Sequence, residues 1–249
     1  MAQLVLRADD NGLCTLTLNR PERLNALNIE VFRELRAHVE ELERQFDKVG
    51  CVVLRGAGRC FSAGHDLGAI ESQGESRENT VRFEAETVTR LANLPMPVVT
   101  AVHGHCYTGA LELALAGDII IASQSARFAD THGKWALTPV WGLSQRLPRR
   151  VGLAKAKEMM FTTRTYSGEE AAAMGLANMC VPEESFAAEV EALARSILAA
   201  SWFSNRANKR LLIATDGMPL GEGLRYELEH SEGIGPDAAE RIMAFSKKG

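Results

Sequence analysis

Residues 97–122, with the sequence PVVTAVHGHCYTGALELALAGDIIIA, decide the fold of this chain of 249 residues. The runs at 98–102 and 119–121 are short and fully or nearly apolar, as expected of strands buried on both faces. Between them, residues 109–115 are predicted to form a short apolar helix. A strand, a helix and a second strand in this order predict a right-handed crossover between parallel strands. We therefore expect an α/β fold with a largely parallel sheet.

The sequence before this segment extends the same pattern. Residues 51–54 are a further apolar strand, and the β-rich runs 4–6 and 13–18 flank a DDNG turn that predicts a β-hairpin. From Asn28, a plausible helix cap, apolar residues step by three and four and predict an amphipathic helix. The residues on this predicted buried face are Phe32, Leu35, Val39, Leu42, Phe46 and Val49.

The sequence after Gly142 is mainly helical. Helices are expected at 153–161, 168–174, 183–198, 206–214 and 220–229, with one strand at 177–181. We expect a core of residues 1–195 and a helical extension of residues 196–249. The extension carries an apolar stripe that we expect to cover a neighbouring subunit, formed by Leu211, Leu212, Met218, Leu220 and Leu224.

Composition excludes several classes of protein. The 28 basic and 32 acidic side chains give a net charge of −4, which argues against nucleic-acid binding. No apolar stretch approaches the roughly 20 residues that span a bilayer, and the start does not resemble a signal peptide, so we expect a cytoplasmic protein without membrane insertion. The five cysteines are scattered with no CxxC pair. We expect them to be reduced and mostly buried, with no disulfide framework.

A glycine-rich loop, GAGRCFSAGHDL at 56–67, follows the strand at 51–54. Open α/β sheets place ligands at the carboxyl ends of their strands. Small residues let a ligand approach the backbone, and a tight bend at Gly64 would turn an N–H group outward. An ordinary glycine-rich turn has the same composition, so spacing alone leaves both interpretations open.

A second loop, at 103–108, leads into the apolar helix. Backbone N–H groups at the start of a helix lack partners, so Thr108 and Gly109 are expected to favour negative charge. Glu112 lies on nearly the same face as Gly109, and a lone carboxylate in an apolar helix is unfavourable unless it is used or paired. No metal site is expected, because His103, His105 and Cys106 have no further partner at zinc-like spacing. No Walker A, GxGxxG or GxSxG motif occurs either.

Further segments occur in a fixed order along the chain. They are LNRPERLNAL at 18–27, SAGHDL at 62–67, PVVTAVHG at 97–104, TGALELA at 108–114, GDI at 117–119, QRLPRRVG at 145–152 and AAAMGL at 171–176. In order and spacing they resemble the crotonase superfamily, also called the enoyl-CoA hydratase/isomerase family, over essentially the whole length.

The resemblance implies a spiral of ββα units and a trimer, or a hexamer made of two trimers, assembled through the C-terminal helices. It also implies an acyl-coenzyme A thioester as substrate, with coenzyme A as part of that substrate and no separate cofactor. Two backbone N–H groups, of His65 and Gly109, would stabilise the thioester enolate or oxyanion, which suits preorganised donors. By position, the coenzyme A path would be lined by Arg23, Asn25, Ala26, Ala63, His65, Asp66, Leu67, Gly68 and Gly109.

One departure from the family concerns catalysis. Hydratases of the family use two glutamates, of which Glu112 matches the first, whereas His132 stands in place of the second. We expect Glu112 to be the principal acid/base and His132, with a typical pKa of about 6.5, to face it. In such a pair each group would favour the charged form of the other. Asp130 is the competing candidate for the proton transfer, with His132 then packing a loop.

The aromatic residues and His65 leave further alternatives open. A histidine at the position of His65 also occurs in the family's methylmalonyl-CoA decarboxylase, where its side chain belongs to the active site; otherwise only its N–H matters. Trp135 and Trp141 are expected to form either an acyl-pocket wall or core.

Three functions are therefore considered. The leading one is an enoyl-CoA hydratase-like lyase of fatty acid metabolism. The others are an acyl-CoA hydrolase or decarboxylase with the same oxyanion hole, and a non-catalytic acyl-CoA-binding protein, which the missing glutamate would explain.

Overall fold

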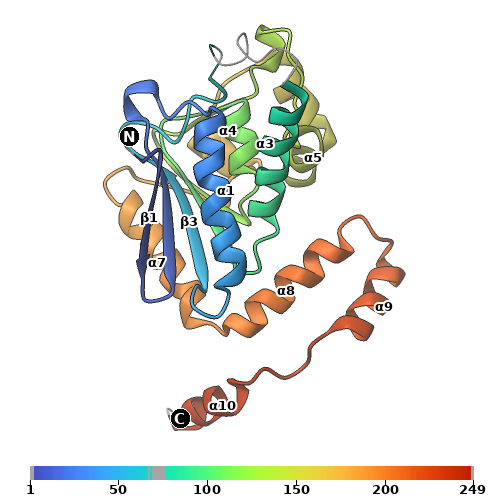
Figure 1. Ribbon diagram of the computed structural model, residues 1–249. Helices are drawn as coiled ribbons and strands as arrows, with labels where there is room; N and C mark the ends of the chain where they lie inside the picture. The colour runs from blue at the N-terminus through green and yellow to red at the C-terminus, as the bar shows by residue number, and fades with distance from the viewer. Residues whose placement is uncertain (1–2, 67, 69–76, 248–249) are drawn as a thin grey trace.

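The computed structural model describes residues 3–66, 68 and 77–247, and over these residues the strands form two sheets (Figure 1). The larger sheet has the order β1-β2-β3-β4-β6-β9 and the smaller one β5-β7-β8. The bounds of the larger sheet are β1 (Val5–Asp10), β2 (Leu13–Leu18), β3 (Cys51–Gly56), β4 (Val98–Val102), β6 (Ile119–Ser123) and β9 (Met179–Val181). Those of the smaller are β5 (His105–Tyr107), β7 (Arg127–Ala129) and β8 (Tyr166–Ser167).

The predicted hairpin and the predicted parallel core are both confirmed. Strands β1 and β2 pair antiparallel, and the turn places Asn11 at φ 47° and Gly12 at φ 85°, as a two-residue hairpin turn requires. Every later pairing in the larger sheet, from β2–β3 to β6–β9, is parallel.

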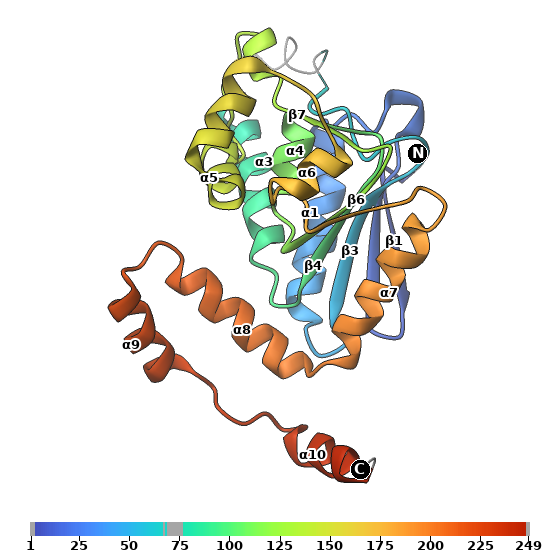
Figure 2. The same cartoon turned by 180° about the vertical axis from the view of Figure 1, so that it is seen from behind.

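Helices cover both faces of the larger sheet. On one face lie α1 (Ile29–Arg44), α3 (Arg77–Ala92) and α4 (Gly109–Ala114), whose apolar side chains form the main core. On the other face lies α7 (Phe186–Ala199), visible when the molecule is seen from behind (Figure 2). The cap predicted for α1 is confirmed, because the Asn28 side chain accepts a hydrogen bond from the Val31 N–H at 3.0 Å.

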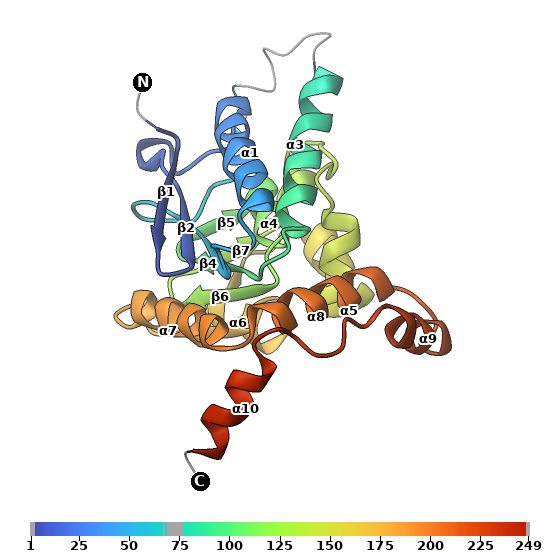
Figure 3. The ribbon, with the colours of Figure 1, turned by 60° about the horizontal axis from the view of Figure 1, so that its bottom comes forward.

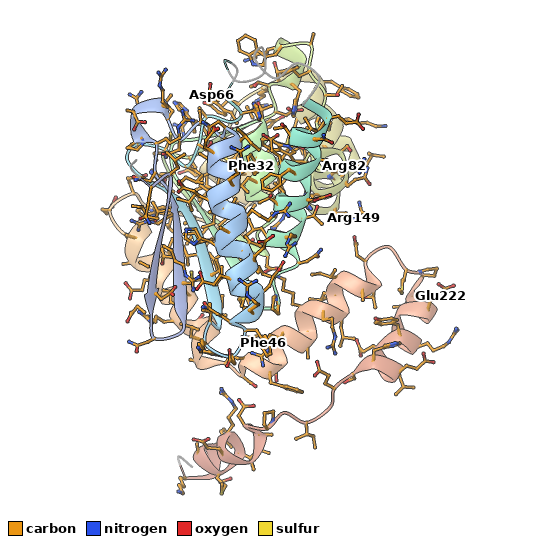
Figure 4. The ribbon with its side chains drawn as sticks, viewed as in Figure 1. Phe32, Phe46, Asp66, Arg82, Arg149 and Glu222 are labelled. Carbon is orange, nitrogen blue, oxygen red and sulfur yellow. The ribbon has the colours of Figure 1, made fainter. Side chains whose placement is uncertain are left out.

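Phe46 is the exception on the predicted face of α1. The helix ends at Arg44, and Phe46 is 47% exposed, so its assignment to the core was wrong. Instead it lies near α8 (Trp202–Thr215), where the Arg206 guanidinium is 5.5 Å from its ring centroid (Figure 4). The apolar periodicity of the sequence therefore continues beyond the end of the helix.

The smaller sheet forms because strands alternate between two layers. Strand β4 is followed by β5 and α4, and β6 is followed by β7 and α5 (Leu143–Thr162), so each unit reads strand, strand, helix. An isolated bridge between Ser62 and Cys106 brings the loop after β3 beside β5. The two loops that the sequence singled out therefore lie side by side.

The C-terminal half is helical, as predicted, but with different bounds. Helix α5 consists of two helical stretches joined at Gly152, whose φ of 77° and ψ of 156° are not helical; the second stretch agrees with the predicted helix at 153–161, and the first, from Leu143, was not predicted. Helix α10 (Ala238–Ser246) was not predicted at all. Further helical elements among the described residues are η1 (Pro21–Arg23), η3 (His132–Lys134), α6 (Gly168–Ala173) and α9 (Leu220–His230).

The last three helices lie at the edge of the molecule, and α10 projects from it (Figure 3). Helix α8 runs along its base, where the Lys209 ammonium lies 2.7 Å from Asp118 Oδ2 and 3.1 Å from the Met96 carbonyl oxygen. Helices α9 and α10 bury no residue of their own. In the described part of the chain, no helix combines the length and apolarity needed to cross a membrane.

Candidate active site

A cavity of about 780 Å³ lies where the loops after β3 and β5 meet α3, α4 and η3. Asp66, one of the residues that line the cavity, lies at the opposite end of the molecule from α8 (Figure 4). Among the residues predicted to form the site, most line this cavity: Arg23, Ala26, Ala63, His65, Asp66, Gly68, Gly109, Glu112 and His132.

Two predicted binding residues are not in this set. Asn25 does not line the cavity: it is 1% exposed, and its Nδ2 donates to the carbonyl oxygens of Ala57 and Cys60 at 2.8 Å. Its side chain thus holds the loop after β3 in shape. Leu67 lies outside the described residues.

Two unpaired backbone amides meet on the cavity wall. Within the described residues, neither the His65 N–H nor the Gly109 N–H donates a hydrogen bond to another protein group. Gly64 lets the two loops touch, because a Cβ there would lie 2.6 Å from the Tyr107 carbonyl oxygen and 3.6 Å from the Gly109 nitrogen. Its φ of 104° also favours glycine. Both amides are therefore available to a ligand oxygen.

Thr108 holds the start of α4 in a strained conformation. Its φ of 53° and ψ of −108° are rare for a β-branched residue. Three hydrogen bonds of Thr108 maintain these angles. The Thr108 N–H donates to the Ala129 carbonyl oxygen at 2.8 Å. The Thr108 hydroxyl accepts from the Thr131 N–H at 3.1 Å and forms a hydrogen bond with the Thr131 hydroxyl at 2.5 Å. Such strain is typical of functional sites.

Glu112 is the buried carboxylate of the cavity, with 1% of its surface exposed. One oxygen, Oε1, accepts from the N–H groups of Trp141 at 2.8 Å and Leu143 at 3.1 Å. The other, Oε2, lies 3.8 Å from Nε2 of His132. Burial raises the pKa of Glu112, although both backbone donors and the nearby imidazole act to lower it. Desolvation thus outweighs the attraction to His132, contrary to the expected stabilisation of the charged form.

His132 is positioned by Asp130. Its Nδ1 lies 2.6 Å from Asp130 Oδ1, which also accepts the His132 backbone N–H at 3.1 Å. Donation from Nδ1 to the carboxylate directs Nε2 towards Glu112. Asp130 is buried and does not line the cavity, so it contacts the reacting centre only through His132.

Sequence reasoning missed Glu84, a second carboxylate of the cavity. It is 1% exposed, and its Oε1 lies 3.4 Å from Nε2 of His65. A signal was present, since Val81, Glu84, Val88 and Leu91 share one face of α3 at helical spacing. A charge among apolar residues on that face is the same pattern that singled out Glu112.

Trp141 forms the part of the cavity wall beside His65 and Gly109. It is 3% exposed, its ring centroid lies 5.3 Å from that of His65, and a Cβ on Gly109 would lie 2.5 Å from its ring. Trp135 also lines the cavity but is 54% exposed. Of the two tryptophans, Trp141 therefore serves both as core and as cavity wall.

The described residues contain no group of three His, Cys, Asp or Glu side chains arranged to hold a metal ion. His103 bonds the Gly58 carbonyl oxygen at 2.9 Å, and His105 Nδ1 lies 3.0 Å from the Tyr107 hydroxyl. Burial raises the pKa of the Cys106 thiol well above its usual value, so it is a poor nucleophile.

Comparisons with known proteins identify the family of this chain. The family model for enoyl-CoA hydratase/isomerase matches residues 8–244. The chain is 34% identical to 1,2-epoxyphenylacetyl-CoA isomerase from Escherichia coli (strain K12), covering 100% of this chain and 97% of that protein. It is also 34% identical to a probable enoyl-CoA hydratase from Mycobacterium tuberculosis, covering 99% and 96%.

Solved structures show the same fold. An enoyl-CoA hydratase from Bacillus anthracis superposes with a TM-score of 0.94 at 29% identity, covering 99% of this chain and 97% of that one. A putative enoyl-CoA hydratase from Thermobifida fusca, solved in complex with acetoacetyl-CoA, gives 0.84 at 28% identity, with 91% and 92% covered. The chain belongs to the enoyl-CoA hydratase/isomerase family, the crotonase superfamily, and is an acyl-CoA-processing enzyme of that family.

Proposed function

We propose that the protein hydrates the double bond of a 2-enoyl-CoA thioester in this cavity. The supporting observation is that the amides of His65 and Gly109, which have no partner among the described residues, line the same cavity as the buried pair of Glu112 and His132. The thioester carbonyl oxygen lies between the two amides, where they stabilise the charge that develops on it. Arg23, Ala26, Ala63, Asp66 and Gly68 line the coenzyme A path, and coenzyme A enters only as part of the substrate.

The reaction uses one proton held by the Glu112–His132 pair. A water oxygen bonds to the β-carbon and its proton passes to the Glu112 carboxylate, while the π electrons move onto the thioester oxygen as an enolate. The α-carbon then takes a proton from Nε2 of the His132 imidazolium, which Asp130 stabilises. The proton on Glu112 finally returns to His132 across the 3.8 Å gap. Water is consumed, and a 3-hydroxyacyl thioester leaves.

A hydrolase using the same amides is the second candidate, because His132 replaces the second glutamate of the family's hydratases. In that reaction the water attacks the carbonyl carbon, the C–S bond breaks and a free thiol is released. Decarboxylation fits less well, since the buried carboxylate of Glu84 beside His65 would repel a carboxylated acyl group.

Absorbance of the enoyl-thioester band, followed with a panel of 2-enoyl-CoAs, tests the proposal. A decrease in this band without thiol release supports hydration. Thiol release from saturated acyl-CoAs identifies a hydrolase instead. Binding of acyl-CoA without either signal would identify a non-catalytic binding protein.

A further inference from the structure

Glu84, on α3, is a buried carboxylate that the proposed hydration does not use. It lines the cavity, and within the described residues its one side-chain partner is His65, at 3.4 Å. A carboxylate has about four acceptor positions, and its burial is unfavourable unless they are filled. Among the described residues, Glu84 is therefore short of hydrogen-bond donors, and it lies where a ligand can reach it.

His65 is also incompletely paired. Its Nδ1 is buried and has no hydrogen-bond partner among the described residues. The imidazole ring lies beside Trp141, whose backbone N–H binds Glu112. The ring and Glu84 thus lie near the reacting centre, beside an amide that we assign to the thioester oxygen.

Apolar side chains also line the cavity. Glu84 and His65 place two polar groups on a wall that can also hold a hydrocarbon chain, an arrangement that fixes the orientation of a ligand with a polar substituent. The apolar side chains of this wall are Val81, Trp135, Leu137, Val140 and Trp141.

We propose that Glu84 and His65 form a specificity subsite for an acyl group that carries a hydroxyl. The inference rests on the proposed function only in placing the acyl chain in this cavity. The hydroxyl donates to the Glu84 carboxylate. A methyl group in its place would leave that carboxylate buried without the donor, and sites built in this way discriminate strongly against the analogue that lacks the hydroxyl.

Matched thioesters that exchange a terminal hydroxyl for a methyl group test the subsite. One pair is trans-4-hydroxybut-2-enoyl-CoA and trans-pent-2-enoyl-CoA, compared by kcat/KM. A longer saturated pair, 6-hydroxyhexanoyl-CoA and heptanoyl-CoA, is compared by calorimetric binding, which needs no turnover. We expect the hydroxylated member of at least one pair to be preferred by about tenfold or more, the typical effect of a hydrogen bond to a charged group.

Variants then assign the preference to Glu84. Glu84→Leu should bring the ratio to about one or below, while Glu84→Gln, which keeps an acceptor oxygen, should retain part of it. The control is Glu86→Gln, whose exposed carboxylate pairs with Arg36 and which should leave the ratio unchanged. Equal or weaker binding of both hydroxylated thioesters by the unmodified protein, or a ratio that survives Glu84→Leu, overturns the inference. Absence of hydration alone refutes the proposed function and leaves the binding ratio to decide the subsite.

Discussion

A single imidazole, that of His132, joins two carboxyl groups at the reacting centre. Asp130 lies 2.6 Å from its Nδ1, and Glu112 lies 3.8 Å from its Nε2. The form proposed to be active holds one proton between Glu112 and His132.

The first prediction concerns His132. Replacing it with Gln should lower turnover by about 10²–10⁴, the usual contribution of a positioned acid or base. Glu112→Gln should lose more. His103→Gln, at a histidine that bonds Gly58 outside the cavity, is the control. Full activity of His132→Gln would make His132 structural, and a strong gain of hydratase activity in His132→Glu would favour the hydrolase.

The second prediction separates the Gly109 amide from the space around it. Any side chain at this position meets Trp141, so Gly109→Ala and Gly109→Pro both introduce that contact, and Pro alone also removes the N–H. Kinetics with a common enoyl-CoA should show Pro slower than Ala by about 10²–10³, the effect of one oxyanion donor. Equal rates in two folded variants, verified by circular dichroism, would contradict the role of this amide.

The third prediction follows from the raised pKa of Glu112. The folded protein holds the Glu112 proton more tightly than the unfolded chain does. The resulting stabilisation of the folded state is complete below the ordinary pKa of 4.5 and is lost as pH rises through the raised pKa. Glu112→Gln, which stays neutral, should therefore melt at a higher temperature than the unmodified protein at pH 7. The difference should shrink towards pH 4. An equal or lower melting temperature of the variant at pH 7 would argue that the buried Glu112 carboxyl does not destabilise the folded protein at that pH.

The two glutamates show how far single residues can be predicted from sequence. Glu112 stood out because every neighbour in its short helix is apolar. Glu84 belongs to a helix with more polar residues, where one charge on the apolar face is easily overlooked. Its contact with His65, nineteen positions away, depends on the path of the chain between β3 and α3, which periodicity does not specify.

Among the elements, those with a local signal were predictable and those set by packing were not. Helix α1 carries its cap and its apolar stripe in sequence. Helix α5 contains Pro148 and breaks at Gly152, and its first stretch, from Leu143, had no clear local signal because Pro usually ends a helix. Helix α10 follows a glycine- and proline-containing stretch and buries no residue, so nothing distinguished it from a disordered tail.

The fourth prediction concerns how α8 is attached. Lys209 is 7% exposed, and its loss would leave Asp118 Oδ2 and the Met96 carbonyl oxygen without this donor. Lys209→Met should lower the free energy of unfolding by about 2–3 kcal/mol, less than for a fully buried pair because Asp118 is partly exposed. Urea unfolding measures the change. Arg210→Met, at an exposed pair with Glu232, is the control, and an equal effect there would count against the anchoring role.

At the scale of the whole molecule, α9 and α10 bury none of their residues within one chain. Glu222 on α9 lies well away from the core (Figure 4), and both helices expose large apolar side chains. Apolar surface of this kind usually marks an interface. The exposed residues include Leu220, Leu224, Leu228, Ile242, Met243 and Phe245.

The fifth prediction is therefore a homotrimer or hexamer in solution. Light scattering at micromolar concentration should give a mass three or six times 27.2 kDa, and a species of 27.2 kDa would contradict it. Truncation after Gly217 should abolish the assembly and leave the core folded, because α9 and α10 bury no residue against it. Loss of the folded core on truncation would show that the extension is needed within one chain.

Trp141 gives the protein an optical reporter. Its indole lies beside the His65 imidazole and against Gly109, while Trp135 is exposed and Trp202 packs on the turns at Gly12 and Gly50. A thioester seated on the Gly109 amide would change the surroundings of this indole. In a protein with Trp135 and Trp202 replaced by Phe, the fluorescence of Trp141 alone would follow substrate arrival in real time.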